Sequence, residues 1–372
     1  MKNSILVSTP SRLCLFGEHL DYLELEVIAV AINLRFSAEI AKREDSLINI
    51  KIRDSKIDTL GASNEMGLYE EHSIDISKPI TYENNRDYLK SSVNILLKNG
   101  YALGGFDVKM DSNIPIGKGM CSSSTMIVVL IKALLEGMGH PDAENPEKIA
   151  YLGFLAEVAE FNEPGGMMDH YTSALGNLVN LDFEGGETKV SRISHNLTGK
   201  FILFDSLEQK DTTRVLANAK NPALSAIEKL SPYGIKSVKD CIKGDNEKYL
   251  EKLENPEKKV LAAAIDNYKI LLEAKKIFKS GNVDNKEIGE LIWKHHKNLR
   301  DGLDISTEKI ELILKIAMEN GAWGGKINGS GGGGCAYVYA DESDCERIIE
   351  AVATLGYPGQ VIHQDSGVRR DN

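Results

Sequence analysis

The sequence predicts an α+β protein of two domains, and three observations support this class. The chain has 372 residues, enough for two domains, although one large α/β unit would also fit. Stretches with strand-like and helix-like patterns follow one another along most of the chain. Near the C-terminus a strand, a helix and a further strand occur in residues 335–370, a pattern typical of helices packed on a sheet.

The bulk composition is that of an ordinary globular protein. Hydrophobic residues make up 42% of the chain, charged residues 27%, and the net charge is −11. This negative balance argues against a protein that binds nucleic acid or anionic membranes through a basic face. No apolar run approaches the roughly 18 residues that span a bilayer. The first residues lack the apolar core of a signal peptide, so we expect a cytoplasmic protein.

The five cysteines are widely spaced and include no CxxC pair. Neither a disulfide framework nor a zinc site is therefore expected. Cys121 lies among serines after a glycine turn, where a small buried side chain is a better interpretation than a reactive thiol.

The N-terminal residues 4–16, SILVSTPSRLCLF, are predicted to form two short strands that are broken at Pro10. The polar stretch GEHLDY follows at residues 17–22. It brings three titratable groups together just after an arginine: Arg12, Glu18, His19 and Asp21. A solvated turn would explain this stretch, but such a cluster between apolar segments favours a functional site.

Further elements lead to the second motif. Residues 42–80 are mixed polar and strand-like, with SLINIKI as the clearest strand. Residues 84–99 show apolar spacing typical of a helix, which should end at Asn99-Gly100. Residues 104–114 then alternate as a strand does.

The second motif is PIGKGMCSSST, residues 115–125, followed by an apolar segment predicted to be a buried helix. Gly117 and Gly119 permit unusual backbone conformations. The serines Ser122, Ser123 and Ser124 are typical of a helix start and are expected to cap it. A glycine turn before a helix N-terminus offers free N–H groups and the positive end of the helix dipole to a phosphate. On this stretch alone, an ordinary capped loop explains the pattern equally well. Arg12, Lys118 and Lys326 are cations that could meet a nucleotide.

A third polar candidate follows a helix predicted for residues 146–162, with Pro146 in its first turn. The turn at residues 164–166 leads to Asp169, which has apolar neighbours. Such an aspartate is either a helix-start cap or a functional carboxylate, and on its own the cap is the better interpretation. Strands are predicted for residues 177–183 and 199–206.

The rest of the chain is first helical and then rich in glycine. Residues 222–321 are predicted to form four or five helices, divided at Pro232, Pro256, Gly281 and Gly302. Two adjacent histidines in this region, His295 and His296, point to different sides of a helix and are expected to be surface or packing residues. The stretch GAWGGKINGSGGGGCAYVYA, residues 321–340, contains two predicted strands. Glycines between strands indicate close approach of another backbone or a ligand. A helix and one last strand, QVIHQDSGVRR, complete the chain.

Three glycine-containing motifs now stand in order, SRLCLFGEHLDY, PIGKGMCSSST and GGKINGSGGGGCAYV. Together they resemble the GHMP kinase superfamily, from about residue 8 to about residue 340. The resemblance implies an N-terminal α/β domain like ribosomal protein S5 over residues 1–185. It implies a ferredoxin-like α+β domain over residues 186–372, with the active site between the two domains. ATP and Mg²⁺ are the cofactors that this family implies.

The motif GEHLDY is similar to the sugar motif of the galactokinases. This likeness implies that Glu18, His19, Asp21 and the backbone of Gly166 bind a monosaccharide. PGGMMDHYTSALG is similar to the galactokinase stretch with the catalytic aspartate, so Asp169 and Arg12 are implied as catalytic residues. Asp169 would accept the proton of the attacking hydroxyl group or hold that group and Arg12 in line.

The phosphate loop is implied to bind ATP through Gly117, Lys118, Gly119, Cys121, Ser122, Ser123 and Ser124. Ser123 and Glu157 would hold Mg²⁺, with Glu160 as an alternative to Glu157 because one residue is missing before Asp169. Leu23, His170 and Cys14 depart from the galactokinase pattern, which has asparagine, glutamine and asparagine at these positions. These departures leave the particular sugar open.

The expected function is ATP-dependent phosphorylation of a monosaccharide at its anomeric hydroxyl group. Two alternatives remain from the sequence. One is a GHMP kinase for another small alcohol, of mevalonate or heptose type. The other is a sugar-sensing relative without catalysis, which would not need Arg12, Ser123, Glu157 and Asp169. The oligomeric state and the residues that contact adenine are not determined by the sequence.

Overall fold

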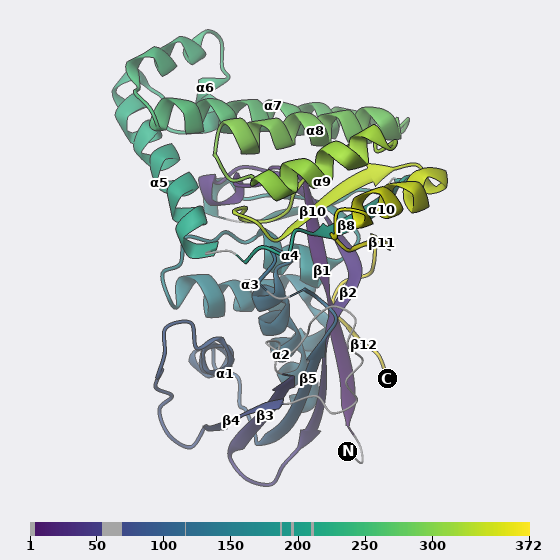
Figure 1. The fold of residues 1–372 in the computed structure, drawn as a ribbon. Coiled ribbons are helices and arrows are strands. Elements are labelled where there is room, and N and C mark those ends of the chain that lie inside the picture. The colour runs from purple at the N-terminus through teal and green to yellow at the C-terminus, as the bar shows by residue number, and fades with distance from the viewer. Residues whose placement is uncertain (1–3, 54–68, 116, 187, 195–196, 210–211) are drawn as a thin grey trace.

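A computed structural model describes residues 4–53, 69–115, 117–186, 188–194, 197–209 and 212–372 (Figure 1). Part of the strand-like segment 42–80 and Ile116 of the second motif lie outside these residues. Two sheets with helices packed against them give the two-domain α+β fold that the sequence predicts.

The first sheet has eight strands. Six follow the order β12-β1-β2-β5-β3-β4, and β6 joins β2 and carries β7. All pairs are antiparallel except β3 with β5. The bounds are β1 (Ile5–Phe16), β2 (Val27–Lys42), β3 (Leu47–Arg53), β4 (Tyr69–Asp75), β5 (Phe106–Ser112), β6 (Leu178–Asp182), β7 (Lys189–Arg192) and β12 (Arg369–Arg370).

Four helices pack on this sheet and around one another: α1 (Tyr88–Lys98), α2 (Ser122–Met138), α3 (Pro146–Phe154) and α4 (Met168–Leu175). Helix α2 contacts β1 and β2 and is buried on nearly every side, which explains its continuous apolar sequence. A π-helical turn, Leu155–Ala159, extends α3. Short 3₁₀ turns occur at Asp21–Leu23, Pro141–Glu144, Glu184–Gly186, Ser231–Tyr233, Asn246–Lys252 and Glu342–Asp344.

The second sheet has the order β11-β8-β10-β9, with all pairs antiparallel. Its strands are β8 (Lys200–Asp205), β9 (Gly324–Ile327), β10 (Cys335–Ala340) and β11 (Gly359–Ile362). Figure 1 shows most of the remaining helices gathered at this end of the molecule. They are α5 (Thr212–Leu230), α6 (Val238–Cys241), α7 (Glu257–Ser280), α8 (Asn285–Asp301), α9 (Glu308–Glu319) and α10 (Cys345–Ala353).

Several predicted boundaries are confirmed. Helix α1 ends at Lys98, Asn99 is its C-terminal cap, and Gly100 follows with φ of 83°. Pro232 lies in the 3₁₀ turn after α5, Pro256 precedes α7, and Gly281 and Gly302 end α7 and α8. His295 and His296 are buried packing residues, because α8 lies against β9 and β10.

Two predictions about strands are wrong. Residues 5–16 form one strand, because a register shift between Pro10 and Ser11 absorbs the proline without ending the pairing with β2. The final stretch forms two strands in different sheets, since β11 pairs with β8 whereas β12 pairs with β1. Strands β12 and β7 both belong to the first sheet, although both follow residue 185. The division at residue 185 stays a prediction.

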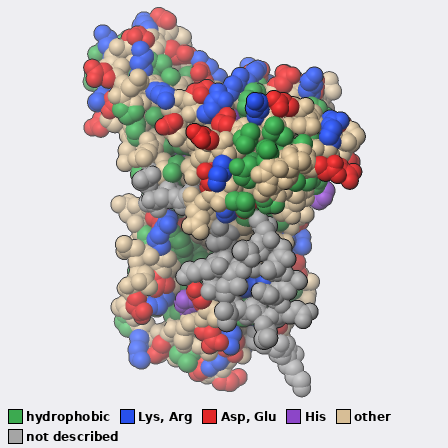
Figure 2. Space-filling model, in the orientation of Figure 1, with side chains coloured by type: hydrophobic (Ala, Val, Ile, Leu, Met, Phe, Trp, Pro, Cys, Tyr) green, Lys and Arg blue, Asp and Glu red, His purple; other side chains and the backbone are tan. Residues whose placement is uncertain are grey.

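The described helices include none with the length and apolar character needed to cross a bilayer. On the face seen in Figure 2, acidic and basic side chains are interspersed over the helices gathered at the second sheet. The side chains visible there form no continuous basic surface. The cytoplasmic location stays a prediction.

The C-terminal segment is held against the end of α4. The amide of Val368 donates to the carbonyl oxygen of Ala174 at 3.0 Å, and a Cβ atom at Gly367 would lie 2.1 Å from that oxygen. Only glycine therefore allows this backbone approach. The contact supports the helix that carries Asp169.

We predict that Gly367→Ala lowers the free energy of unfolding by about 2 kcal/mol, because the new methyl group must push two backbones apart. Urea denaturation followed by circular dichroism measures this. Gly104→Ala is the matched control, since a Cβ atom there meets nothing within 4 Å. It should change stability by less than about 1 kcal/mol. Equal effects of the two substitutions would contradict the close approach.

Candidate active site

One cavity of about 280 Å³ lies where the three glycine-containing motifs meet. It is lined by nearly all the residues that the sequence singled out: Arg12, Glu18, His19, Asp21, Gly117, Gly119, Cys121, Ser122, Ser123, Ser124, Glu157, Gly166 and Asp169. Lys118 does not line it, because its Nζ atom lies 3.1 Å from Asp205 and donates to the carbonyl oxygen of Glu208. The predicted role of Lys118 stays a prediction.

The third motif packs directly on the second. A Cβ atom at Gly329 would lie 2.6 Å from the carbonyl oxygen of Gly119, and one at Gly334 would lie 2.4 Å from that of Lys118. Both glycines have positive φ. The amide of Cys335 donates to Lys118 O at 2.8 Å. These contacts confirm that the glycine-dense stretch allows close approach of another backbone.

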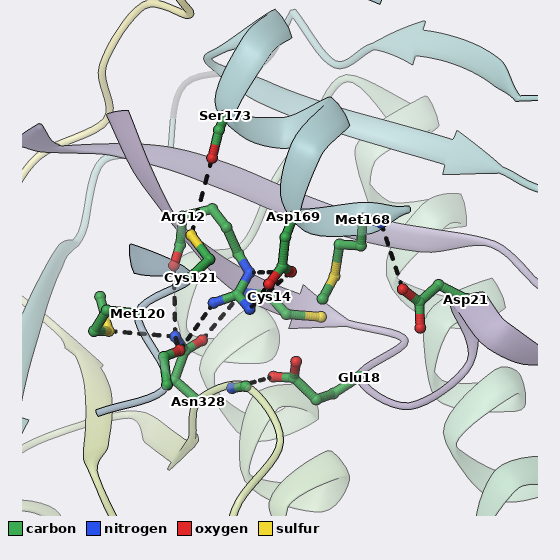
Figure 3. A network of polar contacts seen from close by, with 12 residues as sticks. Arg12, Cys14, Glu18, Asp21, Met120, Cys121, Met168, Asp169, Ser173 and Asn328 are labelled. Atoms are coloured by element: carbon green, nitrogen blue, oxygen red, sulfur yellow. Dashed lines mark hydrogen bonds and ion pairs between the residues drawn. The ribbon is translucent and has the colours of Figure 1, made fainter. Parts of the chain in front are cut away.

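The lining of the cavity includes a paired arginine and aspartate (Figure 3). Arg12, in the middle of β1, donates from Nε and Nη2 to the two carboxylate oxygens of Asp169, each at 2.8 Å. Its Nη1 donates to the carbonyl oxygen of Gly119 at 3.1 Å. Although burial favours the neutral form, the charge of Asp169 raises the pKa of Arg12 above its usual value.

Asp169 is the second residue of α4, and Met167 is the residue before the helix. Its carboxylate is bound to Arg12, so the cap interpretation is wrong. Since Arg12 is 3% exposed and Asp169 is 27% exposed, the carboxylate is the member of the pair that a substrate can reach.

Asp21 forms one wall of the cavity. Its carboxylate accepts hydrogen bonds from the amides of Tyr22 at 3.0 Å and Met168 at 3.4 Å. Burial and the nearby charge of Asp169 raise its pKa to about 6. A Cβ atom at Gly166 would lie 2.0 Å from Oδ2 of Asp21, so any other residue here would displace this carboxylate.

Glu18 is held by the third motif. Its Oε2 atom accepts hydrogen bonds from Nζ of Lys326 at 2.6 Å and from the amide of Gly329 at 3.0 Å. Lys326 is fully buried and does not line the cavity, so it is not a free cation for phosphate as the sequence suggested. Burial alone would raise the pKa of Glu18, but the charges of Lys326 and Arg12 hold it below its usual value.

The N-terminus of α2 also lines the cavity, through Ser122, Ser123 and Ser124. Gly117, Gly119 and Cys121 all have positive φ, and Cys121 is the residue before the helix. Helix α2 begins at Ser122 as predicted, but no side chain caps it, so the capping role of the serines is wrong. Instead, Oγ of Ser123 donates to Glu157 at 2.6 Å. The N–H groups of the first turn of α2 have no partner within the helix and point out of its N-terminal end.

Glu157 joins Ser123 to His170. The imidazole Nε2 of His170 lies 2.7 Å from Oε2 of Glu157. Burial would raise the pKa of Glu157, but His170 and the serines hold it below its usual value. Glu160 instead accepts from Tyr82 at 2.5 Å and Lys98 at 2.6 Å, away from Ser123. The geometry therefore selects Glu157 over Glu160 as the partner of Ser123.

Of the three departures from the galactokinase pattern, His170 lines the cavity, whereas Leu23 and Cys14 do not. His170 contacts Glu157, and its Nδ1 atom finds no hydrogen-bond partner among the described residues. Leu23 is 8% exposed and belongs to the hydrophobic core rather than to the lining of the cavity.

Several residues of this region were missed by the sequence reasoning. Nδ1 of His19 lies 2.8 Å from the Tyr22 hydroxyl group. Arg86, a further cation of the lining, forms two hydrogen bonds with Glu163, at 2.7 and 2.6 Å. Asn328 donates to Gly119 O at 3.0 Å and accepts from the amide of Cys14 at 3.2 Å (Figure 3). Only the position of Asn328 between the strands of a glycine-dense motif could have pointed to it.

Three family models match the chain. The GHMP kinases N terminal domain matches residues 87–177, the GHMP kinases C terminal model matches residues 278–358, and the galactokinase galactose-binding signature matches residues 1–42. With this fold and these three motifs around one cavity, the chain belongs to the GHMP kinases.

Similar proteins include the galactokinase of Pyrococcus furiosus, 24% identical over 94% of this chain and 93% of the relative. The galactokinase of Bacillus subtilis is 25% identical over 97% of this chain and 90% of the relative. Among solved structures, Lactococcus lactis galactokinase complexed with galactose has a TM-score of 0.81 at 20% identity, covering 99% of this chain and 95% of that one. Methanococcus jannaschii mevalonate kinase has a TM-score of 0.70 at 20% identity, with coverage of 98% and 99%.

The raised pKa of Asp21 predicts a pH dependence of stability. The native carboxyl group keeps its proton up to about pH 6, whereas the unfolded one loses it near pH 4. The native state therefore binds more protons in this interval, and stability should fall as the pH rises through it. We expect the unfolding free energy of Asp21→Asn, relative to the unsubstituted protein, to increase by about 2 kcal/mol between about pH 4 and pH 7.

Urea denaturation at a series of pH values measures this difference. Asp266→Asn on the exposed side of α7 is the control for loss of one negative charge. A constant difference between Asp21→Asn and the unsubstituted protein at all pH values would show that burial does not disfavour the charged form of Asp21.

Proposed function

We propose that this protein transfers the γ-phosphoryl group of ATP to the anomeric hydroxyl group of a neutral monosaccharide. One observation carries the proposal. The Arg12–Asp169 pair shares a single cavity with Glu18, His19 and Asp21 and with the N-terminus of α2. The relatives named above as galactokinases and the match to the galactose-binding signature support a sugar as acceptor.

The acceptor side suits an uncharged molecule with many hydroxyl groups. Its carboxylates and imidazole would bind hydroxyl groups in fixed directions, which discriminates strongly against analogues that lack one of them. Both arginines of the described cavity lining already bind carboxylates, Arg12 with Asp169 and Arg86 with Glu163. An acidic sugar would therefore meet Asp21 without gaining a cation among the described lining residues.

The nucleotide side suits phosphate. The N–H groups in the first turn of α2 and the positive end of its dipole favour an anion, and α2 is long enough, at 17 residues, to present them. Gly117 and Gly119 let the backbone turn close to the site, since their φ values are 69° and 81°. The γ-phosphoryl group would then lie towards Arg12 and Asp169.

Asp169 would hold the attacking hydroxyl group and take its proton, while Arg12 keeps the carboxylate in place. Arg12 would also balance the negative charge that spreads over the transferred phosphoryl group. Phosphoryl transfer needs little covalent work from the protein, so positioning and charge balance account for most of the catalysis.

Mg²⁺ fits Ser123 and Glu157, because both offer oxygen atoms beside the phosphate side of the cavity. The described residues contain no group of three or more His, Cys, Asp or Glu that could hold a metal. This is compatible with an ion that takes its remaining ligands from phosphate and water. When bound, Mg²⁺ would neutralise phosphate charge.

The proposal is tested by ADP release over a panel of acceptors. The panel contains neutral hexoses and deoxyhexoses, matched uronic acids, heptoses and mevalonate. Turnover of a neutral hexose or deoxyhexose, with a product phosphorylated at carbon 1 by ³¹P NMR, is expected. Turnover of mevalonate alone would contradict it, and so would binding of sugar and ATP without ADP formation.

We predict that Asp169→Asn lowers kcat at least about 10³-fold, because the amide cannot take the proton and no longer forms the double ion pair with Arg12. Nucleotide affinity, measured by calorimetry with ADP, should change less than about threefold. A variant that keeps most of its kcat would show that Asp169 is not the group that holds the hydroxyl.

We predict that Glu157→Gln raises the Mg²⁺ concentration needed for half-maximal rate about tenfold, because one anionic ligand is lost. The same shift should occur in the Mg²⁺ dependence of ADP binding, measured by calorimetry without turnover. Glu160→Gln is the matched control on the same segment and should stay within about twofold. A larger effect of Glu160→Gln would reverse the assignment.

A further inference from the structure

We infer that Lys326 is a positioning residue for sugar binding, which it supports by holding Glu18 in place from the second sheet. The inference rests on the proposed function for its substrate. Lys326 lies 308 residues after Glu18 in the chain and does not line the cavity.

The first step is the environment of the lysine. Lys326 lies on β9, and its side chain is 0% exposed. Its Nζ atom donates to Oε2 of Glu18 at 2.6 Å and to the carbonyl oxygen of Cys14 at 3.1 Å. The ring centre of Tyr337 lies 5.4 Å from Nζ. A lysine is almost never fully buried without such a partner, so Glu18 is the reason that it can lie here.

The second step is the environment of the glutamate. Glu18 lines the cavity, yet its two named donors, Lys326 and the amide of Gly329, both belong to the third motif. Both donors bind the same oxygen, Oε2. The third motif therefore determines where this carboxylate points, although the rest of the acceptor wall belongs to the N-terminal part of the chain.

The third step is that Lys326 has no direct access to substrate. It is absent from the cavity lining, and its ammonium group is already engaged with two oxygen atoms. An effect of Lys326 on substrate must therefore pass through Glu18. Other groups also act on this carboxylate, namely Arg12 and His19, and Cys14 and Asp21 lie close enough to sense its charge. Of these groups, Lys326 is the one whose opposite charge comes with a hydrogen bond to Glu18 among the described contacts, at 2.6 Å.

Removal of the ammonium group would leave a buried carboxylate without its main counter-charge, which is strongly unfavourable. Glu18 would then take up a proton or turn away. Either change alters the acceptor wall while the N-terminus of α2 keeps its structure. The expected signature is weakened sugar binding with unchanged nucleotide binding.

The test is a double-mutant cycle of Lys326→Met and Glu18→Gln, with KM values for sugar and for ATP. Lys326→Met should raise the sugar KM at least about tenfold and leave the ATP KM within about twofold. In the Glu18→Gln background the same change should alter the sugar KM less than about threefold, because the residue through which it acts is gone. Equal effects in the two backgrounds would overturn the inference, as would a parallel rise in both KM values.

Lys275→Met is the matched control for a broken ion pair. Lys275 pairs with Glu26, a mostly buried glutamate outside the cavity. This variant should leave both KM values within about twofold. A rise in the sugar KM equal to that of Lys326→Met would show that lost stability, rather than the position of Glu18, causes the effect.

A second measurement needs no substrate and separates this inference from the proposed function. If the unsubstituted protein phosphorylates no sugar, the proposed function is contradicted. The pKa of the Glu18 carboxyl group still tests whether Lys326 holds Glu18 in its charged form. ¹³C NMR of labelled glutamate carboxyl groups, with Glu18 identified by its loss in Glu18→Gln, reports its pKa. Lys326→Met should raise this pKa above the usual glutamate value, because burial then dominates. An unchanged pKa would overturn the inference.

Discussion

The constraint on which the site depends is that a charge removed from water needs a partner. Around one cavity, Asp169 is bound to Arg12, Glu18 to Lys326, and Glu157 to Ser123 and His170. Each pair joins segments that are distant in the chain, because the partners lie on different elements. The polar site and the assembly of the fold are therefore the same set of contacts.

Asn328 shows how closely the three motifs are bound together. Its side chain accepts from the amide of Cys14 in the first motif and donates to the carbonyl of Gly119 in the second. Gly329 and Gly334 let the third motif approach the backbone of the second. The third motif thus completes a cavity whose other lining residues belong mostly to the N-terminal part of the chain.

Much of the fold and site could be predicted from local patterns. The helices were readable because apolar spacing and terminal residues such as Pro256 and Gly281 act locally. The two strands of residues 360–370 could not be separated, because strand partners are chosen by distant chain segments. Lys326 was predicted to be a free cation and the serines were predicted to be caps. The sequence does not show which distant group each of these side chains contacts in the fold.

The sequence by itself determined the family, the three motifs and many of the residues that line the cavity, because glycine turns and clustered titratable side chains carry a signal within a few positions. The tertiary structure decided how those residues are used. It bound Asp169 to Arg12, chose Glu157 over Glu160 for Ser123, and turned Lys326 towards Glu18. The physical reason is that pairing of buried charges depends on distances across the fold, which local sequence does not contain.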